Sequence, residues 1–559
     1  MNKLIYSLIL VNSLIFPQWL KNEKATKTTA GNLIMENVPS IPIEIKEKSR
    51  RYSNIRSASF RSWSQDGKGM LIATGFGETT QLHKIERPLG QRKQITFYDE
   101  PVGGGYFSSD NSKNGFLFSK DIGGNEYWQV YYYDFDKGKE IMLTDGKTRN
   151  SIGGWSNNGK FFAFSSNKEN GVDMNVFIND LEGNEKQLFS KKGSWSFLDW
   201  SPDDKKVIVR RYISINESYV HVVEINNNKM TRFNDSEEKI SYGNVLYSKD
   251  GKGMYYTSDE GTEFRHLRYY DIRSDKHTIL TKHIDWDVRG FTLSDNGKYI
   301  AFVTNEDAIS KLHVVRTKDF KEIKIPNLPI GQIGSLKFNS DNNRLALTLN
   351  TPKSPGDIFV VDLKKSRLTR WTESEVGGLN NNQFVVPELV HVNSFDGLKV
   401  SGFLYRPKTK GPHPVIISIH GGPEGQYRPG FSSRFQYWIN ELNCAVLATN
   451  VRGSAGFGKT FVKMDNGYNR EKSVKDIGAF IDMIADDNTL DSKRVGVCGG
   501  SYGGYMVLAS MTHFNDRLKA AVDVVGISNF VTFLRNTKAY RRNLRRAEYG
   551  DERIPEMHD

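Results

Sequence analysis

Residues 494–514 read RVGVCGGSYGGYMVLASMTHF, and they join an apolar strand to an apolar helix through a glycine-rich turn. The turn fits the pattern G-x-S-x-G, with Ser501 between Gly499 and Gly503. In so tight a turn, side chains two residues before and after the serine would clash, which explains both glycines. The pattern therefore predicts a strained nucleophile elbow that exposes the Ser501 hydroxyl. The less favoured alternative is a turn in which Ser501 only caps the helix.

The stretches around this turn alternate short apolar strands with helices. Continuous apolar runs are typical of strands buried on both faces, so we expect a parallel sheet with helices on both faces over residues 388–559. One covering helix, 473–487, has apolar residues at helical spacing and Ser473 as its expected cap. The expected strands are PVIISIH from Pro414, CAVLATN from Cys444, RVGVC from Arg494 and AAVDVVG from Ala520.

Acyl transfer from a serine also needs backbone N–H groups that stabilise the oxyanion. Tyr502, directly after the serine, is the first candidate, and Gly422 in the loop His420-Gly421-Gly422-Pro423 is the second. Glycine suits this role because it lets the backbone approach a substrate closely. His420 is a candidate base, but we favour a structural role in the loop, because enzymes with this turn order their catalytic residues serine, acid, histidine.

The chain before residue 390 repeats one phrase seven times: an aromatic or apolar residue, a serine, a turn of Asp, Asn or Gly, and an apolar strand. The copies are spaced 44 to 48 residues apart, which is typical of a four-stranded propeller blade. A second hairpin completes several copies, for example VYYYDFDKGKEIMLT from Val130. We therefore expect an all-β seven-bladed β-propeller over residues 55–385. The copies begin at Trp63, Phe107, Trp155, Trp200, Tyr247, Leu293 and Phe338.

Three motifs behind this propeller together resemble the prolyl oligopeptidase family, in particular its bacterial dipeptidyl aminopeptidase and acylaminoacyl peptidase branch: HGGP at 420–423, NVRGSAGFG at 450–458 and GGSYGGY at 499–505. The resemblance implies an α/β-hydrolase domain and a serine-type peptidase that hydrolyses short peptides through an acyl-enzyme on Ser501. It also implies oxyanion donors at Tyr502 and Gly422, a triad completed by an Asp and then a His, and no metal or organic cofactor. Homo-oligomers fit the family, although no stretch of the sequence specifies one.

The acid and the histidine of this triad have no match in the 58 residues after Ser501. Asp523 falls inside an expected strand, and His513 and Asp516 lie near the helix that follows the turn. We therefore expect the triad Asp and His beyond residue 559, an α/β domain that is incomplete at its C-terminus, and little catalysis by this truncated chain. Two other hypotheses stay open: a non-catalytic propeller protein that binds peptides and carries a hydrolase remnant, or an esterase.

Residues 453–460, GSAGFGKT, also satisfy the phosphate-loop pattern G-x-x-x-x-G-K-[ST]. A phosphate loop opens directly into a helix whose N-terminus holds the phosphates. The segment that follows, FVKMDNGYNREKS, is interrupted by Gly467 and has no apolar stripe. Nucleotide binding is therefore disfavoured.

The formal charge of +12 is compatible with a nucleic-acid partner, but no nucleic-acid motif accompanies it and we expect no such partner. We interpret the basic stretch 535–546 and the acidic stretches 235–238 and 259–263 as solvated surface. Cys444 and Cys498 lie in apolar runs, which indicates buried packing rather than a disulfide framework or a metal site.

The N-terminal segment has one lysine and then a largely apolar run, 4–16, which is shorter than the ~20 residues that cross a bilayer. It fits the apolar region of a signal peptide. We therefore expect residues 1–30 to be an export segment, the protein to be periplasmic or secreted, and no stable membrane span. The alternative is an apolar N-terminus of a cytoplasmic protein.

Overall fold

A computed structural model describes residues 27–558 and divides them into two compact units, with the boundary after Arg50. The expected export segment lies outside the described residues except for 27–30. No helix in the described range is long and apolar enough to cross a membrane. The smaller unit holds the hairpin of β1 (Lys27–Ala30) and β2 (Leu33–Glu36), and α1 (Ile43–Ser53) continues into the larger unit.

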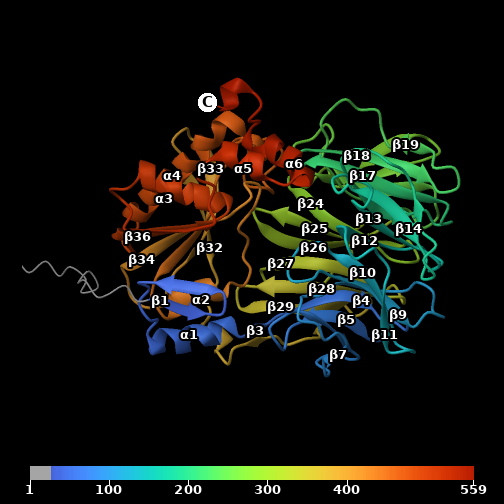
Figure 1. The fold of residues 1–559 in the computed structure, drawn as a ribbon, viewed down its shortest axis with the longest axis horizontal. Coiled ribbons are helices and arrows are strands. Elements are labelled where there is room, and N and C mark those ends of the chain that lie inside the picture. The colour runs from blue at the N-terminus through green and yellow to red at the C-terminus, as the bar shows by residue number, and fades with distance from the viewer. Residues whose placement is uncertain (1–26, 559) are drawn as a thin grey trace, which may run out of the picture. The chain divides into compact units, whose positions relative to one another are not determined.

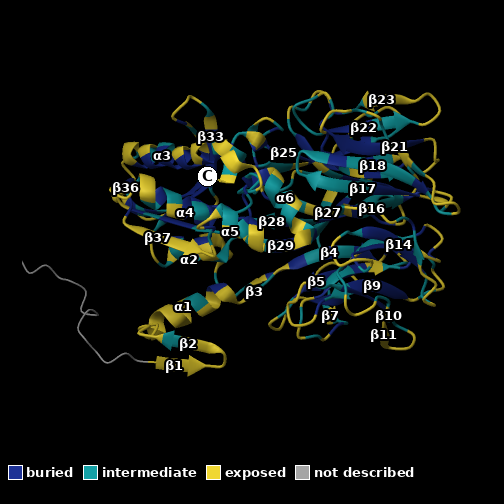
Figure 2. Cartoon of the chain, turned by 45° about the horizontal axis from the view of Figure 1, so that its top comes forward, coloured by how far each residue is buried: buried dark blue, intermediate teal, exposed yellow. Residues whose placement is uncertain are grey.

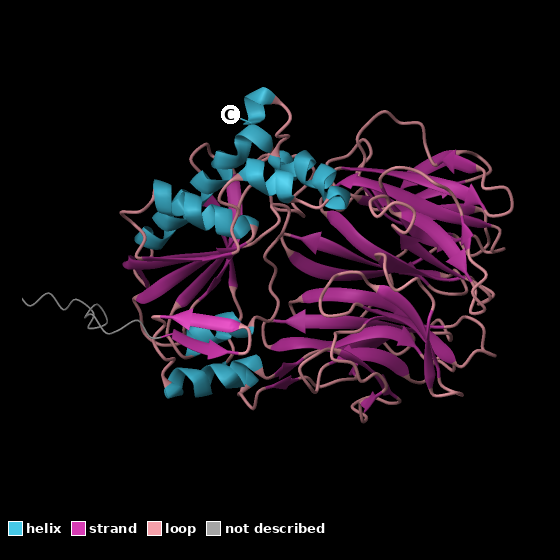
Figure 3. Cartoon of the chain, in the orientation of Figure 1, coloured by secondary structure: helices cyan, strands magenta, loops and turns pink. Residues whose placement is uncertain are grey.

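The larger unit begins with seven antiparallel sheets, so the predicted seven-bladed propeller is confirmed (Figures 1 and 3). The sixth blade has three strands, and an isolated bridge between Val315 and Glu322 stands where the others have a fourth. The first four blades are β4 (Ala58–Trp63), β5 (Met70–Thr74), β6 (Gln81–Ile85) and β7 (Lys93–Gln94); β8 (Gly103–Phe107), β9 (Gly115–Lys120), β10 (Gln129–Asp134) and β11 (Lys139–Met142); β12 (Asn150–Trp155), β13 (Phe162–Ser166), β14 (Asn175–Asn179) and β15 (Lys186–Gln187); β16 (Ser194–Trp200), β17 (Lys206–Ser214), β18 (Glu217–Glu224) and β19 (Met230–Arg232). The last three are β20 (Tyr242–Tyr247), β21 (Gly253–Ser258), β22 (His266–Asp271) and β23 (Lys276–Ile279); β24 (Asp287–Leu293), β25 (Tyr299–Glu306) and β26 (Ile309–Arg316); β27 (Gln332–Phe338), β28 (Arg344–Thr351), β29 (Ser354–Asp362) and β30 (Arg367–Arg370).

The serine of the repeated phrase explains why the phrase recurs. In the first blade, Ser64 Oγ accepts a hydrogen bond from Gly69 N (2.9 Å) and donates one to Asp66, which closes the turn between the first two strands. The equivalent pair of bonds is made in later blades by Ser156, Ser201, Ser248 and Ser294. In every blade the first strand also shifts register once against the second, and such bulges increase the local twist.

Side-chain packing between the first and seventh blades closes the ring. Phe60 N donates to Thr348 Oγ1 (2.9 Å), and Trp63 Nε1 donates to the carbonyl oxygen of Lys337 (3.1 Å). Beside this seam, β3 (Ile55–Arg56) pairs with β31 (Glu375–Val376) and joins the segments that enter and leave the propeller. The two blades share one buried cluster, which contains Ala58, Phe60, Trp63, Met70, Ile72, Ile85, Ala346, Ile358, Val360 and Trp371.

The C-terminal domain contains a six-stranded sheet in the order β32-β33-β35-β34-β36-β37, in which the last four strands are parallel. Helices α3 and α4 bury one face of the sheet, and α2 packs on the other, so the predicted α/β fold is confirmed. The strands are β32 (Glu388–Asn393), β33 (Lys399–Tyr405), β34 (His413–Ile419), β35 (Ala445–Asn450), β36 (Leu490–Gly500) and β37 (Ala520–Val524). The helices are α2 (Ser433–Asn440), α3 (Arg470–Asp486), α4 (Tyr502–His513), α5 (Phe530–Asn536), α6 (Ala539–Tyr549) and α7 (Pro555–His558).

Two details of this domain differ from the sequence-based expectation. The helix expected at 473–487 begins at Arg470, so Ser473 lies inside it and donates to Arg470 O (2.7 Å) instead of capping its start. The strand from Ala520 was expected to be buried on both faces, yet all five residues of β37 are exposed (Figure 2). The reason is that β37 is the edge strand, and a cavity of about 640 Å³ opens between it and α2.

Candidate active site

Ser501 lies in the turn between β36 and α4, with φ 56° and ψ −120°. A positive φ is strained for any residue other than glycine, and such strain is typical of functional turns. A Cβ atom on Gly499 would lie 2.3 Å from Gly503 O, and one on Gly503 would lie 2.4 Å from Ile419 O, so both positions require glycine. Ser501 N donates to Val524 O (3.0 Å). The backbone therefore holds an exposed serine at the end of β36.

The loop after β34 lies directly beside this turn. A Cβ atom on Gly421 would lie 3.5 Å from Ser501 Cβ and 3.9 Å from Tyr502 N, which is the first N–H group of α4. The next residue, Gly422, has φ 134°, a conformation that favours glycine. The loop and the Tyr502 N–H group thus border one position next to the serine.

Helix α6 holds this loop through the carbonyl oxygen of Gly422. That oxygen accepts hydrogen bonds from Tyr549 Oη (2.7 Å) and from Arg545 Nη1 (3.3 Å). The next arginine, Arg546, pairs with Glu552. The interpretation of the basic stretch 535–546 as solvated surface is therefore wrong for Arg545 and Arg546. Arg545 binds the loop after β34, and Arg546 is largely buried against Glu552.

His420 is buried and joins two loops. Burial lowers the pKa of its imidazole. Its Nε2 lies 2.9 Å from Ser454 Oγ, and its Nδ1 lies 2.9 Å from the carbonyl oxygen of Gly421. All 11 histidines of the chain lie in the described range, and none of them hydrogen-bonds to Ser501 there.

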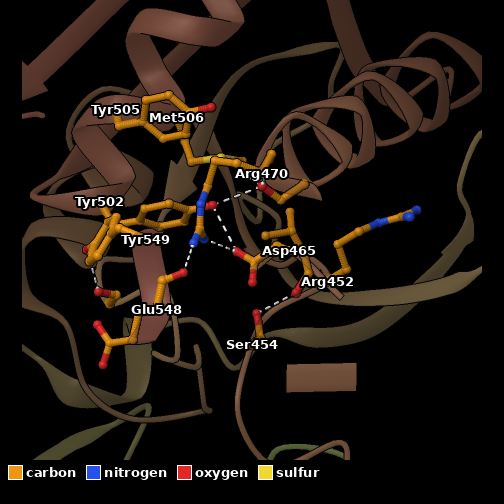
Figure 4. A network of polar contacts seen from close by, with 12 residues as sticks. Arg452, Ser454, Asp465, Arg470, Tyr502, Tyr505, Met506, Glu548 and Tyr549 are labelled. Atoms are coloured by element: carbon orange, nitrogen blue, oxygen red, sulfur yellow. Dashed lines mark hydrogen bonds and ion pairs between the residues drawn. The ribbon is translucent and has the colours of Figure 1, made fainter. Parts of the chain in front are cut away.

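A buried polar network anchors the residue after the serine (Figure 4). Tyr502 Oη donates to Asp465 Oδ2 (3.0 Å) and lies 2.9 Å from Ser473 Oγ. Arg470 Nη1 pairs with the same Asp465 oxygen (2.6 Å), and its guanidinium lies 5.0 Å from the centre of the Tyr502 ring. Burial raises the pKa of Asp465 to about 6, although Arg470 acts in the opposite direction. No motif in the sequence marks Asp465 or Arg470.

Two carboxyl groups meet where the loop after β34 reaches α6. Burial and the neighbouring carboxylate of Glu548 raise the pKa of Glu424 to about 8, and the two side chains are hydrogen-bonded. Glu548 itself pairs with Arg545 Nη1 (2.8 Å). At neutral pH the raised pKa therefore favours a protonated Glu424, which can donate a hydrogen bond.

This pair predicts that stability falls as pH rises from about 4.5 to about 8. The folded-state pKa of Glu424 is raised above the usual value of 4.5, so its stabilising effect is complete below about pH 4.5 and is lost as pH rises through about 8. Glu424→Gln keeps a hydrogen-bond donor and removes the titration. We expect the melting temperature of the wild type, relative to Glu424→Gln, to fall as pH rises from about 5 to about 8 and to level off above that. Parallel melting curves for the two proteins over this range would contradict the assignment.

The loop 453–460 is held by acidic side chains of the propeller. Lys459 Nζ pairs with Glu238 Oε1 (2.9 Å), and Thr460 donates from N (2.7 Å) and from Oγ1 (2.8 Å) to the Glu263 carboxylate. The interpretation of the acidic stretches as solvated turns fits Glu238, which is exposed although it pairs with Lys459. It is wrong for Asp259, which is buried and accepts a hydrogen bond from Ser241 N (2.7 Å), and Glu263 is half-buried. Short 3₁₀ turns follow this loop in place of a helix, at 461–463 and 467–469, which argues against a phosphate loop.

Comparison with known proteins identifies the family to which the chain is similar. A model described as "Prolyl oligopeptidase family" matches residues 429–558, and one described as "Prolyl oligopeptidase, N-terminal beta-propeller domain" matches residues 98–374. Dipeptidyl aminopeptidase BIII of Pseudoxanthomonas mexicana is 24% identical over 76% of this chain and 63% of its own length. Dipeptidyl-peptidase 5 of Porphyromonas gingivalis is 23% identical over 84% of this chain and 69% of its own length.

Solved structures share the fold at low sequence identity. A structure of prolyl oligopeptidase B from Galerina marginata has a TM-score of 0.78 at 16% identity and covers 92% of this chain and 78% of its own. A crystal structure of puromycin hydrolase has a TM-score of 0.78 at 15% identity and covers 91% of this chain and 84% of its own. The fold of 91–92% of this chain therefore recurs in these proteins.

Proposed function

Because the chain belongs to the prolyl oligopeptidase family, we propose that it is a serine peptidase that cleaves short peptides through an acyl-enzyme on Ser501. The observation that carries the proposal is the strained, exposed Ser501 between two positions that only glycine can fill. A hydroxyl held in this way can attack a carbonyl carbon that enters from the open side of the turn.

The proposed oxyanion donors are the backbone N–H groups of Tyr502 and Gly422. The N–H group of Tyr502 is the first one in α4, directly after the serine. The N–H group of Gly422 belongs to the loop that borders Ser501. Donors that are fixed before the reaction stabilise the developing charge without reorganising. In this proposal Tyr549 and Arg545 are positioning residues, because they hold the carbonyl oxygen of Gly422 and so fix the loop.

We propose that the substrates are short peptides with a dipeptidyl or acylaminoacyl group. We also propose that the protein is exported from the cytoplasm. The names of two relatives, dipeptidyl aminopeptidase BIII and dipeptidyl-peptidase 5, support the first part. The apolar run at 4–16 supports the second.

A peptide boronate tests the nucleophile and the substrate class together. A serine hydroxyl adds to boron and forms a tetrahedral adduct whose oxygen occupies the oxyanion position. Where a base accepts the Ser501 proton as the bond to boron forms, a dipeptidyl boronate should bind at least about 100-fold more tightly than the matching peptide carboxylate, in line with other transition-state analogues. Ser501→Ala should remove this difference, and isothermal titration calorimetry measures both affinities.

The same titration separates the other hypotheses. A non-catalytic peptide-binding protein would bind boronate and carboxylate equally and would be indifferent to Ser501→Ala. An esterase would bind a simple alkyl boronate as tightly as the dipeptidyl boronate. Either outcome would exclude the peptidase proposal.

A further inference from the structure

The fourth propeller blade carries an open cavity of about 640 Å³, away from Ser501 in the sequence and not used by the proposed reaction. Its volume lies in the range of about 300–1,000 Å³ that is typical of sites for small organic ligands. Four of the lining side chains are cationic, namely Lys191, Lys192, Arg211 and Arg232. The others include Trp195, Ile213, Tyr219, His221 and Met230.

The sheet register places the central members of this lining on one face of the blade. Trp195 on β16 lies opposite Arg211 on β17, which lies opposite Tyr219 on β18. Two residues along β18, and hence on the same face, His221 lies opposite Arg232 on β19. The rings of Trp195 and His221 are 5.1 Å apart, and the Arg232 guanidinium lies 5.1 Å from the Tyr219 ring.

The loop that bears the two lysines is fixed beside this face. Lys191 N donates to Asn175 Oδ1 (3.0 Å), and Gly193 N donates to Asp173 Oδ1 (2.7 Å). A Cβ atom on Gly193 would lie 3.2 Å from Arg211 Nε, so the loop passes directly next to this guanidinium. The lysines and Arg211 are therefore brought together by the fold.

Positive charge in the cavity is not neutralised by the protein. Within residues 27–558, none of the four cations forms an ion pair with a carboxylate, and two buried atoms, Arg211 Nε and His221 Nδ1, have no hydrogen-bond partner. Buried polar atoms rarely lack a hydrogen-bond partner. Burial, followed by the charges of Arg232, Lys191 and Arg211, lowers the pKa of His221 to about 4.

Two acidic residues also line the cavity, and neither cancels this charge. Glu217 accepts a hydrogen bond from Tyr219 Oη (2.6 Å) and pairs with Lys239 (3.4 Å). Glu237 is exposed. With four cations against two carboxylates, the lining keeps an excess of positive charge that is available to a ligand.

We propose that this cavity binds a small organic anion, whose carboxylate or phosphate group is held by Arg211, Arg232 and the 191–192 lysines. Guanidinium groups match the geometry of both oxyanions, and Tyr219, His221, Ile213 and Met230 supply an apolar wall for the rest of the molecule. The site is distinct from Ser501, and its occupation does not depend on the peptidase proposal.

Calorimetry with four probes tests the site on the full chain. Phenyl phosphate and N-acetylphenylalanine supply the two anions, and phenol and N-acetylphenylalanine amide are their neutral analogues. At least one anion should bind at least about tenfold more tightly than its analogue, and Arg211→Met should reduce that affinity at least tenfold. The anion that binds more tightly identifies the chemistry as phosphate ester or carboxylate.

Two further variants keep the test decisive. Arg367→Met removes an equal charge at an exposed position on β30 of the seventh blade and should leave anion binding unchanged. Lys192→Met removes an exposed cation of the lining and should weaken binding several-fold without affecting folding. Arg211→Met should melt no lower than the wild type, because it relieves repulsion between cations. The proposal is overturned if neither anion outbinds its neutral analogue, or if Arg211→Met and Lys192→Met both bind the anions as the wild type does.

Discussion

A polypeptide of residues 1–559 is expected to hydrolyse a dipeptidyl anilide about 10⁴- to 10⁶-fold more slowly than a family member in which a histidine hydrogen-bonds to the serine. The reason is that no hydrogen bond joins a histidine to Ser501 within residues 27–558, and a serine hydroxyl without an adjacent base is only weakly nucleophilic. His420, the histidine of the adjacent loop, is buried with its Nε2 directed at Ser454. Release of the anilide, followed by absorbance, measures the rate.

Ser501→Ala supplies the control for this expectation. Catalytic residues that act as a unit are not additive, so removing a serine to which no histidine hydrogen-bonds should lower the remaining rate by less than about tenfold. A rate within about 100-fold of that of such a family member, abolished by Ser501→Ala, would show that some other group activates the serine.

The propeller and the serine turn could be predicted because their causes are local. The repeated phrase encodes its own turn, in which Ser64 binds Gly69 five residues later. A Cβ atom on Gly499 would clash with Gly503, four residues later, and one on Gly503 would clash with Ile419 on the neighbouring strand. Such short-range constraints leave a readable pattern of residue types.

The supports of the site could not be predicted, because their partners are distant in the sequence. Glu238 and Lys459 are separated by 221 residues, and Tyr549 meets Gly422 across 127 residues. A charged residue with such a partner has the same local sequence as a solvated one, so the acidic and basic stretches were misread. The exposure of β37 was missed for a similar reason, because strand order decides which strand lies at the edge.

The buried pair under Tyr502 should have the largest effect on stability. Arg470→Met leaves Asp465 buried without its cation, and it also removes the hydrogen bond to the carbonyl oxygen of Glu548. Breaking one side of a buried ion pair costs about 3–5 kcal/mol in the free energy of unfolding. Arg517→Met is a matched control in the same domain, because its pair with Asp482 is exposed and should contribute at most about 1 kcal/mol. Urea unfolding followed by tryptophan fluorescence measures both changes.

The pH dependence of this loss identifies Asp465 as its cause. In the wild type the pKa of Asp465 is already raised to about 6 by burial, and loss of Arg470 removes the charge that opposes this rise. At pH 5 the carboxyl group is largely protonated in both proteins, so Arg470→Met should cost least there. At pH 8 the variant must ionise an unpaired buried acid or keep it protonated at a cost, so the loss should grow as pH rises from 5 to 8. When Asp465→Asn is the reference, adding Arg470→Met removes the cation in a protein that has no titrating group at position 465, and this loss should be independent of pH. A loss of equal size at pH 5 and pH 8 in the single variant would instead assign the effect to packing of the guanidinium against the Tyr502 and Tyr549 rings.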